Sequence, residues 1–490
     1  MKFNWFLPVL VALALGVACG EEESPAPAAP AGTTAPCGEA PFVGSPLGLR
    51  CGQVIDEKGR VVNLWGVNAR VDGIFDVTFD DGRIALETVP PFTAEDAAQM
   101  RSWGFDALRL PINWSGVEPT RDGGFKEEYL DRVQQVLDLA HKEGILVLID
   151  FHQDAYGKDI GEDGAPLWAI EPPPTELLQG PLEDLEKRRL SPQVKAAFET
   201  FFGDSPKGAE LRERFGKMAA HVAARFKDHP AVLGFELFNE PVFASNAQLL
   251  RLHQQVFAAV RAAAPSKLVL FEPPAERNFL DSFALGDGPI GEGTVYAPHI
   301  YKYAFTVFPG GATKESIAKQ NLTTRDEAAS WKAGLMITEW GYNPNGPRAE
   351  EYLTWQRELQ EEIQASSFLW LWKEDSQGRW GCYDHDGSGW TERPRLKEIL
   401  ARVRPAAVAG WPRQYGYDRA SGVFTLTFTA DPTIQAPTRV AVSPVLGAPT
   451  EILCDGVPVA AALQDGALDL DCGRGTATEH TITVKVKPLP

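Results

Sequence analysis

Short apolar runs separated by helical stretches recur along most of this chain, and this alternation constrains the fold more than any other feature. Eight runs have the length and composition of buried parallel strands: Val61–Asn68, Ala107–Pro111, Ile145–Phe151, Val232–Asn239, Lys267–Glu272, Thr294–His299, Leu335–Glu339 and Phe368–Trp372. Between them, apolar residues recur at helical spacing over Thr93–Trp103, Glu127–Glu143, Glu210–Asp228 and Ala247–Ala263. Strands that alternate with helices form a parallel sheet. Eight repeats therefore predict an α/β protein with a closed (β/α)8 TIM barrel over residues 46–405.

The pattern changes near Gln414. Residues 422–430, 439–444 and 481–487 alternate apolar and polar side chains at period two, without helical stretches between them. They predict a small C-terminal antiparallel β-sandwich domain over residues 412–490, joined to the barrel by a linker over Pro405–Pro412. The long segment Ala155–Pro206 after the third strand is rich in glycine, proline and charge, and loops of this length are usually functional or disordered.

The N-terminus has the composition of an export signal. Met1–Ala18 contains Lys2, then an apolar stretch and small residues that end at Cys19, too short for a lasting membrane span. A cysteine after small residues resembles a bacterial lipobox, so residues 1–19 are predicted to be a lipoprotein-type signal with Cys19 as the lipid anchor. Gly16 stands where leucine is usual, which leaves simple signal cleavage as the alternative. Residues 20–45 are acidic and then Pro/Ala-rich, so we expect a tether and an exported protein, either membrane-anchored or secreted.

Charge and cysteine content exclude several classes of protein. With 490 residues, of which 44% are hydrophobic, the chain can form one large and one small domain. A net charge of −19 argues against nucleic-acid binding and against broad attraction to anionic membranes. Cys37 with Cys51 and Cys454 with Cys472 are close pairs that an oxidising compartment would bridge, which leaves Cys382 as a free thiol. The cysteines lack metal-ligand spacing, and no metal or other cofactor is expected.

Polar side chains stand where the predicted strands end, and in a TIM barrel these ends form the catalytic face. The run VLGFELFNEP ends in Asn239 and Glu240, and GLMITEWGY contains Glu339, 99 residues later. That distance leaves room for about three strand-plus-helix units at ~30 residues each, so the two glutamates would face each other across one mouth. Other strands end in or near Arg70, Arg109, His152, Asp154, His299 and Tyr301.

The N-E-P and T-E-W strand ends, with His299 and Tyr301 between them, resemble glycoside hydrolase family 5 of the retaining clan A barrels. The stretch IDFHQDAYGKDIGEDGAPLWA, residues 149–169, is most similar to the endoglycoceramidase group of that family. The resemblance covers roughly Cys51 to Pro405, and the β-rich C-terminal region matches the layout of the same group.

The resemblance implies a role for each polar strand end. Glu240 would be the general acid/base and Glu339 the nucleophile, about 5 Å apart as retention requires. Arg109, His299 and Tyr301 would support them, and Asn239 would bind the 2-hydroxyl of the sugar. Arg70, His152, Asp154 and Lys373 would bind other parts of the glycan. Trp370 and Trp372 are expected to point the same way, one as the platform under the sugar and the other in the core.

The implied activity is hydrolysis of the β-bond between the glycan and ceramide of glycosphingolipids. Apolar loop residues would then form a groove for the lipid: Leu167, Trp168, Ile170, Leu177, Leu178, Phe243, Phe305, Val307 and Phe308. Alternatives within the family are a β-glucosidase that acts on glucosylceramide or steryl glucosides and an endo-β-1,4-glucanase. Outside enzymes, a non-catalytic surface glycan-binding lipoprotein stays open, although a binder has no need of two opposed glutamates. The sequence does not indicate an oligomeric state.

Overall fold

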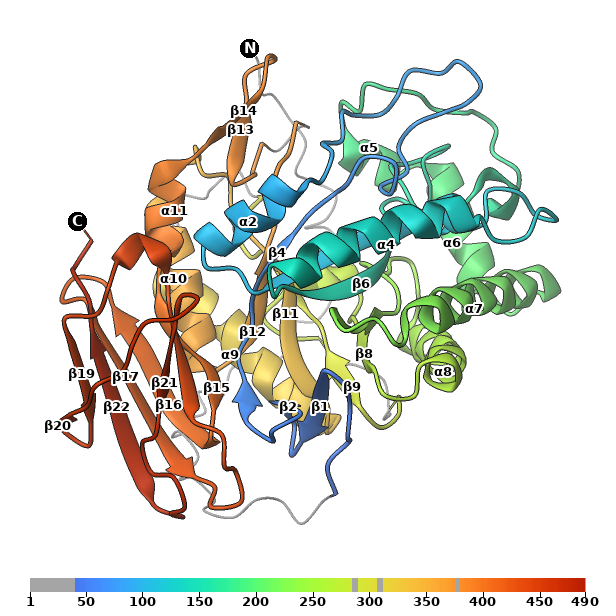
Figure 1. Cartoon of the computed structure of the whole chain (residues 1–490). Coiled ribbons are helices and arrows are strands. Elements are labelled where there is room, and N and C mark those ends of the chain that lie inside the picture. The colour runs from blue at the N-terminus through green and yellow to red at the C-terminus, as the bar shows by residue number, and fades with distance from the viewer. Residues whose placement is uncertain (1–39, 284–289, 306–311, 376–378, 490) are drawn as a thin grey trace, which may run out of the picture.

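A closed barrel of parallel strands forms the centre of the protein in the computed structural model, as predicted (Figure 1). The structure describes residues 40–283, 290–305, 312–375 and 379–489. Its strands are β4 (Trp65–Asn68), β5 (Ala107–Asn113), β6 (Leu146–His152), β7 (Val232–Glu236), β8 (Leu268–Phe271), β9 (Thr294–Tyr296), β10 (His299–Ile300), β11 (Gly334–Trp340) and β12 (Ser366–Leu369). β9 and β10 share one position beside β11, and β12 pairs with β4 to close the barrel of eight positions.

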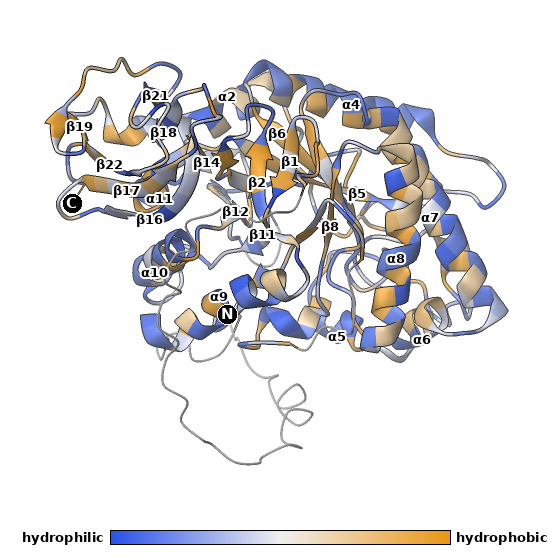
Figure 2. Cartoon of the chain, turned by 90° about the horizontal axis from the view of Figure 1, so that it is seen from below, coloured by the Kyte–Doolittle hydropathy of each residue, from blue (hydrophilic) through white to orange (hydrophobic). Residues whose placement is uncertain are grey.

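Helices surround the barrel and pack their apolar faces against it (Figure 2). The longer ones are α2 (Ala94–Ser102), α4 (Glu127–Lys142), α7 (Pro206–Phe226), α8 (Asn246–Ala263), α9 (Lys314–Ser330), α10 (Ala349–Glu362) and α11 (Pro394–Leu400). Thr93 and Ser245 begin α2 and α8 with capping boxes, which satisfy backbone N–H groups that have no partner within the helix. Gly104 and Gly144 follow α2 and α4 with positive φ, as the chain turns back toward the next strand.

The segment after β6 is longer than a simple connection and contains helices of its own. It comprises a 3₁₀ turn, η1 (Leu167–Ala169), and helices α5 (Leu185–Arg189) and α6 (Pro192–Phe202). Similar insertions follow other strands: helix α3 (Trp114–Val117), turn η2 (Ala275–Asn278), and a hairpin of β13 (Tyr383–His385) and β14 (Trp390–Glu392). The predicted long loop is therefore partly helical, and α5 lies on the side where the barrel strands end (Figure 1).

An N-terminal hairpin closes the other end of the barrel. β1 (Leu47–Arg50) and β2 (Gln53–Asp56) pair antiparallel, and Leu47, Leu49 and Val54 share one buried cluster with side chains from inside the barrel. In the view from below, the two apolar strands lie across the end of the barrel (Figure 2). Because this end is filled, chemistry is confined to the opposite end, where the strands terminate.

The C-terminal domain is a β-sandwich whose first sheet also contains strands from the N-terminus. That sheet has the order β1-β2-β3-β15-β18-β21, with β3 (Val61–Val62), β15 (Val403–Val408), β18 (Thr438–Val442) and β21 (Ala467–Leu470). The second has the order β16-β17-β22-β19-β20, with β16 (Gly410–Asp418), β17 (Val423–Ala430), β22 (Glu479–Lys485), β19 (Glu451–Cys454) and β20 (Val457–Pro458). One apolar cluster, including Val440, Phe424 and Ile482, fills the space between them.

Two sequence-based expectations about this region are wrong. The run Val61–Asn68 is two elements: β3 belongs to the sandwich, and only β4 enters the barrel. The expected linker Pro405–Pro412 is instead part of β15 and β16, which are joined at Ala409. Arg402 pairs with Glu361 of α10 (3.2 Å), and Arg404 pairs with Asp106, which directly precedes β5, so ion pairs join the two domains.

The cysteines partly match expectation. Cys454 and Cys472 form the predicted disulfide. Cys51 is also disulfide-bonded, whereas its predicted partner Cys37 lies outside the described residues, as do the signal segment and Cys19. Among the described residues, Cys382 is a buried free thiol.

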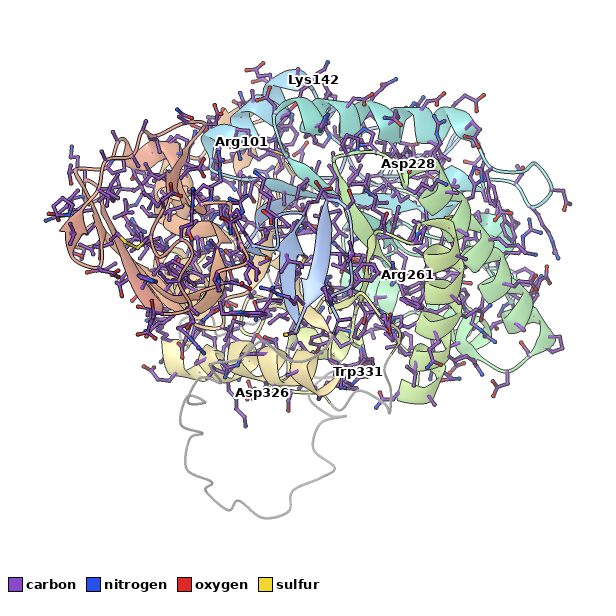
Figure 3. All side chains as sticks on the ribbon, turned by 60° about the horizontal axis from the view of Figure 1, so that its bottom comes forward. Arg101, Lys142, Asp228, Arg261, Asp326 and Trp331 are labelled. Carbon is purple, nitrogen blue, oxygen red and sulfur yellow. A yellow bond between two sulfur atoms is a disulfide. The ribbon has the colours of Figure 1, made fainter. Side chains whose placement is uncertain are left out.

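Charged side chains also cover the outer surface of the barrel. Lys142, Asp228 and Asp326 are exposed and project outward around the barrel (Figure 3). Within the described part of the chain, none of the helices combines the length and apolar character that crossing a membrane requires.

Candidate active site

Arg109 organises a buried cluster at the ends of the barrel strands. Its side chain is inaccessible to solvent, and its guanidinium donates to Glu236 (2.5 Å), Glu339 (2.5 Å), Asn68 (3.0 Å) and Asn239 (2.8 Å). Asp150 and Glu272 lie 3.1 and 3.4 Å from Nη2. The planar guanidinium has donors on every edge and cannot release its charge, so Arg109 of β5 fixes residues that lie in or directly after β4, β6, β7, β8 and β11 relative to one another.

Glu240 follows β7 and projects into this end of the barrel. Its Oε1 accepts a hydrogen bond from Asn278 (2.7 Å) in turn η2 and lies 2.9 Å from Nδ1 of His299. Its Oε2 lies 3.8 Å from the guanidinium of Arg189 at the end of α5. One carboxyl oxygen is thus held by neutral side chains, while the other faces helix α5.

Glu339 of β11 stands opposite Glu240. Oε1 accepts from Arg109 and Oε2 accepts from the hydroxyl of Tyr301 (2.8 Å), so both oxygens have a donor. One carboxyl oxygen of Glu240, one ring nitrogen of His299 and one carboxyl oxygen of Glu339 all lie within 4.8 Å of one another. This spacing matches that of the two carboxyl groups in glycosidases that retain anomeric configuration, about 5 Å.

His299 connects the two glutamates. Its Nδ1 is 2.9 Å from Oε1 of Glu240 and 3.5 Å from Oε2 of Glu339, and its Nε2 is 3.4 Å from Glu272. Burial lowers the pKa of His299 well below its ordinary value, and the charge of Arg109 lowers it further. The imidazole is therefore neutral, and it can take part in hydrogen bonds without adding a second positive charge.

A second histidine forms the wall of the mouth on the other side. His152 Nδ1 is 2.5 Å from Asp150, and its ring stacks on Trp370 with 6.0 Å between centroids. Burial lowers the pKa of His152 to about 3, so it too is neutral. Asp150 orients the ring and leaves Nε2 on the side of Asn239, 3.5 Å from its amide nitrogen.

Four carboxyl groups surround the single guanidinium of Arg109: Asp150, Glu236, Glu272 and Glu339. Burial raises the pKa of each one, while Arg109 opposes the rise. One positive charge cannot compensate four negative charges in a dry interior, so the cluster holds protons at neutral pH. Glu339 has donors to both oxygens, from Arg109 and Tyr301, which favours its ionised form.

This proton uptake leads to a prediction for Asp150, whose pKa is raised by burial from 3.8 to about 7. Between these pH values the folded state keeps a proton that the unfolded chain has released, so wild-type stability falls as pH rises. Relative to Asp150→Asn, which does not titrate, we expect the wild type to lose about 1.4 kcal/mol of unfolding free energy per pH unit in this window. Urea denaturation of both proteins from pH 4 to 9 measures this; a difference that stays constant with pH would contradict it.

Not all predicted site residues join the cluster around Arg109. Lys373 pairs with Asp96, and its ammonium lies 5.0 Å from the ring of Tyr383. Arg70 is buried among Glu87 (2.6 Å), Glu162 (3.3 Å) and Glu374 (3.3 Å), although its guanidinium lies 5.8 Å from the ring of Trp370. Asp154 faces the mouth but forms an ion pair with Arg189.

The two tryptophans do not point the same way, because β12 ends at Leu369 and the alternation of a strand does not continue beyond it. Trp370 lies beside His152 and Arg70 at the mouth. Trp372 is buried, contacts Trp103 and donates to Asp96 (3.0 Å). The structure thus separates a tryptophan at the mouth from one in the core.

The expected lipid groove is only partly present. Leu167, Leu177 and Phe305 are exposed, and Leu178 is half-buried. In contrast, Trp168 packs on Trp114, Ile170 is buried, and Phe243 packs on Phe198. Val307 and Phe308 lie outside the described residues.

Sequence reasoning did not assign six residues that contact this cluster: Asp150, Gln153, Arg189, Glu236, Glu272 and Asn278. Asp150 and Glu236 had a usable signal, since each is a carboxylate inside an apolar strand, where an unpaired charge is not tolerated. Glu272 directly follows β8, so it could have been interpreted, like Glu240, as a functional carboxylate at a strand end. Asn278 and Arg189 come from a 3₁₀ turn and a short helix whose positions depend on tertiary packing.

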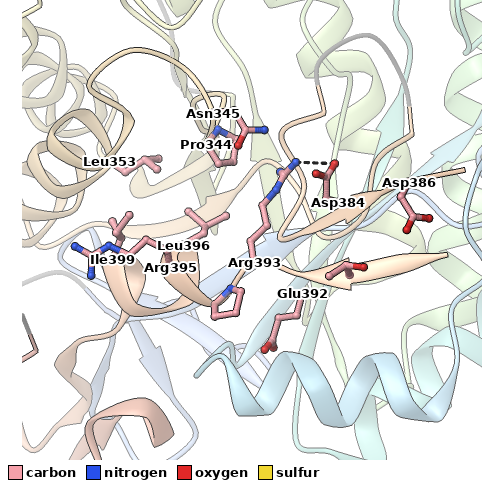
Figure 4. Close-up of a pocket in the computed structure, with 12 residues that line it drawn as sticks. Pro344, Asn345, Leu353, Asp384, Asp386, Glu392, Arg393, Arg395, Leu396 and Ile399 are labelled. Carbon is pink, nitrogen blue, oxygen red and sulfur yellow. Dashed lines mark ion pairs between the residues drawn. The ribbon is translucent and has the colours of Figure 1, made fainter. Parts of the chain in front are cut away.

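The hollow drawn in Figure 4 is not this site. It has a volume of about 480 Å³ and lies between the loop after β11, the β13–β14 hairpin and α11. Its floor contains Leu353, Leu396 and Ile399, and its rim contains an ion pair between Arg393 and Asp384 (3.0 Å). The residues around Arg109 do not line it, so we place the chemistry at the strand ends.

Two family models match this sequence. The sequence model described as cellulase (glycosyl hydrolase family 5) matches residues 56–376, and that of the glycoside hydrolase family 5 C-terminal domain matches residues 402–486. The chain belongs to glycoside hydrolase family 5. The family resemblance inferred from the strand ends is thus confirmed.

Proteins named endoglycoceramidase and glucosylceramidase are among those similar to this chain. Endoglycoceramidase I of Rhodococcus hoagii is 28% identical over 426 residues, which cover 80% of this chain and 78% of that protein. Glucosylceramidase of Rhizopus delemar is 28% identical over 247 residues, 44% of this chain and 34% of that protein. The structure of endo-glycoceramidase II from Rhodococcus sp. superposes with a TM-score of 0.73 at 27% identity, covering 89% of this chain and 99% of that chain. Other structures of that protein contain ganglioside GM3 or a lactosyl-enzyme intermediate.

Proposed function

We propose that this family 5 hydrolase cleaves the β-glycosidic bond between the glycan and the ceramide of glycosphingolipids, with retention of configuration. The observation that carries the proposal is the pair Glu240 and Glu339, with carboxyl oxygens within 4.8 Å of each other in a chain whose relatives include endoglycoceramidases. A glycan-binding protein without activity would gain nothing from placing two carboxylates so close together, because each destabilises the charge of the other.

Glu339 is the nucleophile of the first step. Its carboxylate attacks C1 of the sugar, the bond between C1 and the ceramide oxygen breaks, and Glu240 gives its proton to that oxygen. Arg109 and Tyr301 hold Glu339 in place through hydrogen bonds of 2.5 and 2.8 Å. The product of this step is a glycosyl ester of Glu339 and free ceramide.

In the second step Glu240 acts as a base. It takes a proton from water, the water oxygen attacks C1, and the ester bond to Glu339 breaks. Asn278 and His299 hold Oε1 of Glu240 in both steps, so Oε2 is the oxygen that exchanges the proton.

The residues around the two glutamates suit a sugar in between. Asn239 is fixed by Arg109 and can bind the 2-hydroxyl, and the imidazole of His152 can bind another hydroxyl. Trp370 offers an aromatic face that stacks on the apolar side of a sugar ring.

Apolar side chains beside Tyr301 support a lipid leaving group. Phe305 is 55% exposed and stacks on Trp380 with 4.5 Å between centroids, and Phe279 is 38% exposed. The centroid of Phe305 lies 5.1 Å from that of Tyr301, which donates to Glu339, so this apolar surface begins beside the reacting atoms. Ceramide buries apolar area on such a surface, which is favourable. A polysaccharide would find few hydrogen-bond partners there for its hydroxyl groups.

The test is hydrolysis of lactosylceramide, glucosylceramide and a soluble β-glucan in detergent, with Glu339→Gln as the blank. Release of intact lactose from lactosylceramide, absent from the blank, is the expected result. Release of glucose from glucosylceramide alone would instead assign a glucosylceramidase activity, and activity on the soluble glucan alone would refute the glycolipid proposal while leaving the two-glutamate mechanism.

We also propose that residues 1–19 direct export and that Cys19 carries a lipid, which would keep the enzyme on a membrane. The support is the sequence alone: an apolar stretch, small residues and then a cysteine. Cys19→Ala is expected to move the protein from the membrane to the soluble fraction after cell fractionation, and unchanged membrane association would contradict the anchor.

A further inference from the structure

The peptide unit between Asn239 and Glu240 is held at both of its polar ends by buried side chains that the proposed chemistry does not use. Glu272 Oε2 accepts the backbone N–H of Glu240 (2.9 Å). Gln153 Nε2 donates to the carbonyl of Asn239 (2.6 Å) and to that of Glu240 (3.1 Å). Glu272 follows β8 and Gln153 follows β6, so the strands on both sides of β7 contribute to this arrangement.

The backbone of Glu240 needs such support. Its φ is +41°, in the left-handed region that residues other than glycine, asparagine and aspartate rarely adopt. Conformations of this kind persist only where the surroundings hold them, and they are concentrated at functional sites. If the peptide plane rotated, Asn239 and Glu240 would both change direction, because their Cα atoms flank that plane.

The two holding groups are well suited to this role. Glu272 is 1% exposed and Gln153 is 5% exposed, so water does not compete for their hydrogen bonds. Gln153 is itself fixed, because its side-chain oxygen accepts the backbone N–H of Tyr156 (2.9 Å). Glu272 lies 3.4 Å from Arg109, which also contacts Asn239.

We propose that Glu272 and Gln153 are positioning residues for the acid/base: they fix the Asn239–Glu240 peptide plane and thereby place Oε2 of Glu240 beside the leaving oxygen. Neither residue contacts the substrate. This inference rests on the proposed function, since it assigns these residues to the proton transfers of Glu240 and not to the nucleophilic attack by Glu339.

A displaced acid/base has a chemical signature that general destabilisation lacks. Phenolate is a poor leaving group and needs the proton of Glu240, whereas 2,4-dinitrophenolate leaves without one. Hydrolysis of the glycosyl ester needs Glu240 to deprotonate water, whereas azide attacks C1 directly, displaces Glu339 and gives a β-glycosyl azide with no proton to remove. Loss of positioning should therefore affect phenyl glycosides selectively and make turnover responsive to azide.

The experiment compares kcat/KM for phenyl β-lactoside and 2,4-dinitrophenyl β-lactoside in Glu272→Ala, Glu272→Gln and Gln153→Ala. In both alanine variants we expect kcat/KM for the phenyl substrate to fall by about 100-fold or more and that for the dinitrophenyl substrate by less than about 5-fold. Azide should raise kcat on the dinitrophenyl substrate and yield β-lactosyl azide. In Glu272→Gln, kcat/KM for the phenyl substrate should fall about 10-fold less than in Glu272→Ala, because the amide oxygen can still accept the N–H of Glu240.

The ratio of the two kcat/KM values does not depend on the fraction of folded enzyme, so partial misfolding cannot imitate the result. Glu236→Gln is the matched control: it alters a buried carboxylate that lies 2.5 Å from Arg109 and accepts a hydrogen bond from Thr338. It should lower both kcat/KM values equally and show no azide response. If both alanine variants lose kcat/KM equally on the two substrates and do not respond to azide, this inference is overturned and the proposed function still stands. Wild-type enzyme that cleaves neither lactoside and no glycolipid would overturn the proposed function and this inference with it.

Discussion

Glu339→Gln is expected to lower kcat on the glycolipid substrate by about 10⁴-fold or more. The amide is not a nucleophile, and loss of a covalent catalyst removes the whole double-displacement route. Glu240 cannot replace it, because that carboxylate is held on the opposite side by Asn278 and His299. The amide is nearly isosteric, so the free energy of unfolding should change little compared with the loss of rate.

A trapped intermediate identifies the nucleophile directly. A 2-deoxy-2-fluoro lactoside with a dinitrophenolate leaving group should label the wild type stoichiometrically, and digestion should place the sugar on the peptide that contains Glu339. Glu350→Gln, an exposed glutamate on α10, is the control and should keep the wild-type rate. Label on Glu240, or a Glu339→Gln variant with more than a few per cent activity, would refute the assignment.

Arg109→Met is expected to lower the free energy of unfolding by about 3–5 kcal/mol and to abolish activity. Removing one partner from a buried ionic cluster leaves the others uncompensated, and here four carboxyl groups lose the cation that they share. The pKa values of these groups would rise further, so the folded variant would hold protons that the unfolded chain releases. The destabilisation should therefore grow as pH rises.

Urea denaturation at pH 5 and pH 8 measures this effect. Arg109→Met should lose more stability at pH 8 than at pH 5, and adding Glu236→Gln should restore part of the loss by removing the carboxylate that contacts Nε. A loss that is the same at both pH values, or a double variant less stable than Arg109→Met, would show that the carboxyl groups do not depend on this guanidinium.

The barrel was predictable because its strands are short apolar runs, most of which end in or next to a polar side chain. Glu240 and Glu339 could be found for the same reason, since both stand where an apolar run stops. In contrast, Asn278 and Arg189 reach the site from a 3₁₀ turn and from α5. Their sequences have no periodicity that points to the mouth, and only the packing of the loops places them there.

Sequence reasoning was wrong where residues distant in the chain pair with each other. Val61 and Val62 have the composition of a barrel strand, yet they pair with Val408 and Ala407 in the sandwich. The same pairing converts the expected linker into β15. Period-two patterns show that a segment is a strand, but they do not show which other segment it joins.

The sheet that joins β3 to β15 has a consequence for the order in which this protein can fold. A nascent chain delivers β1, β2 and β3 first, and their partner β15 emerges only after the whole barrel has been synthesised. Until then the edge of β3 carries unpaired backbone groups, which is the state in which strands pair with wrong partners. The first hairpin must therefore be kept from aggregating until the last domain has been synthesised, and a chain that stops before Val403 would be left with that edge open.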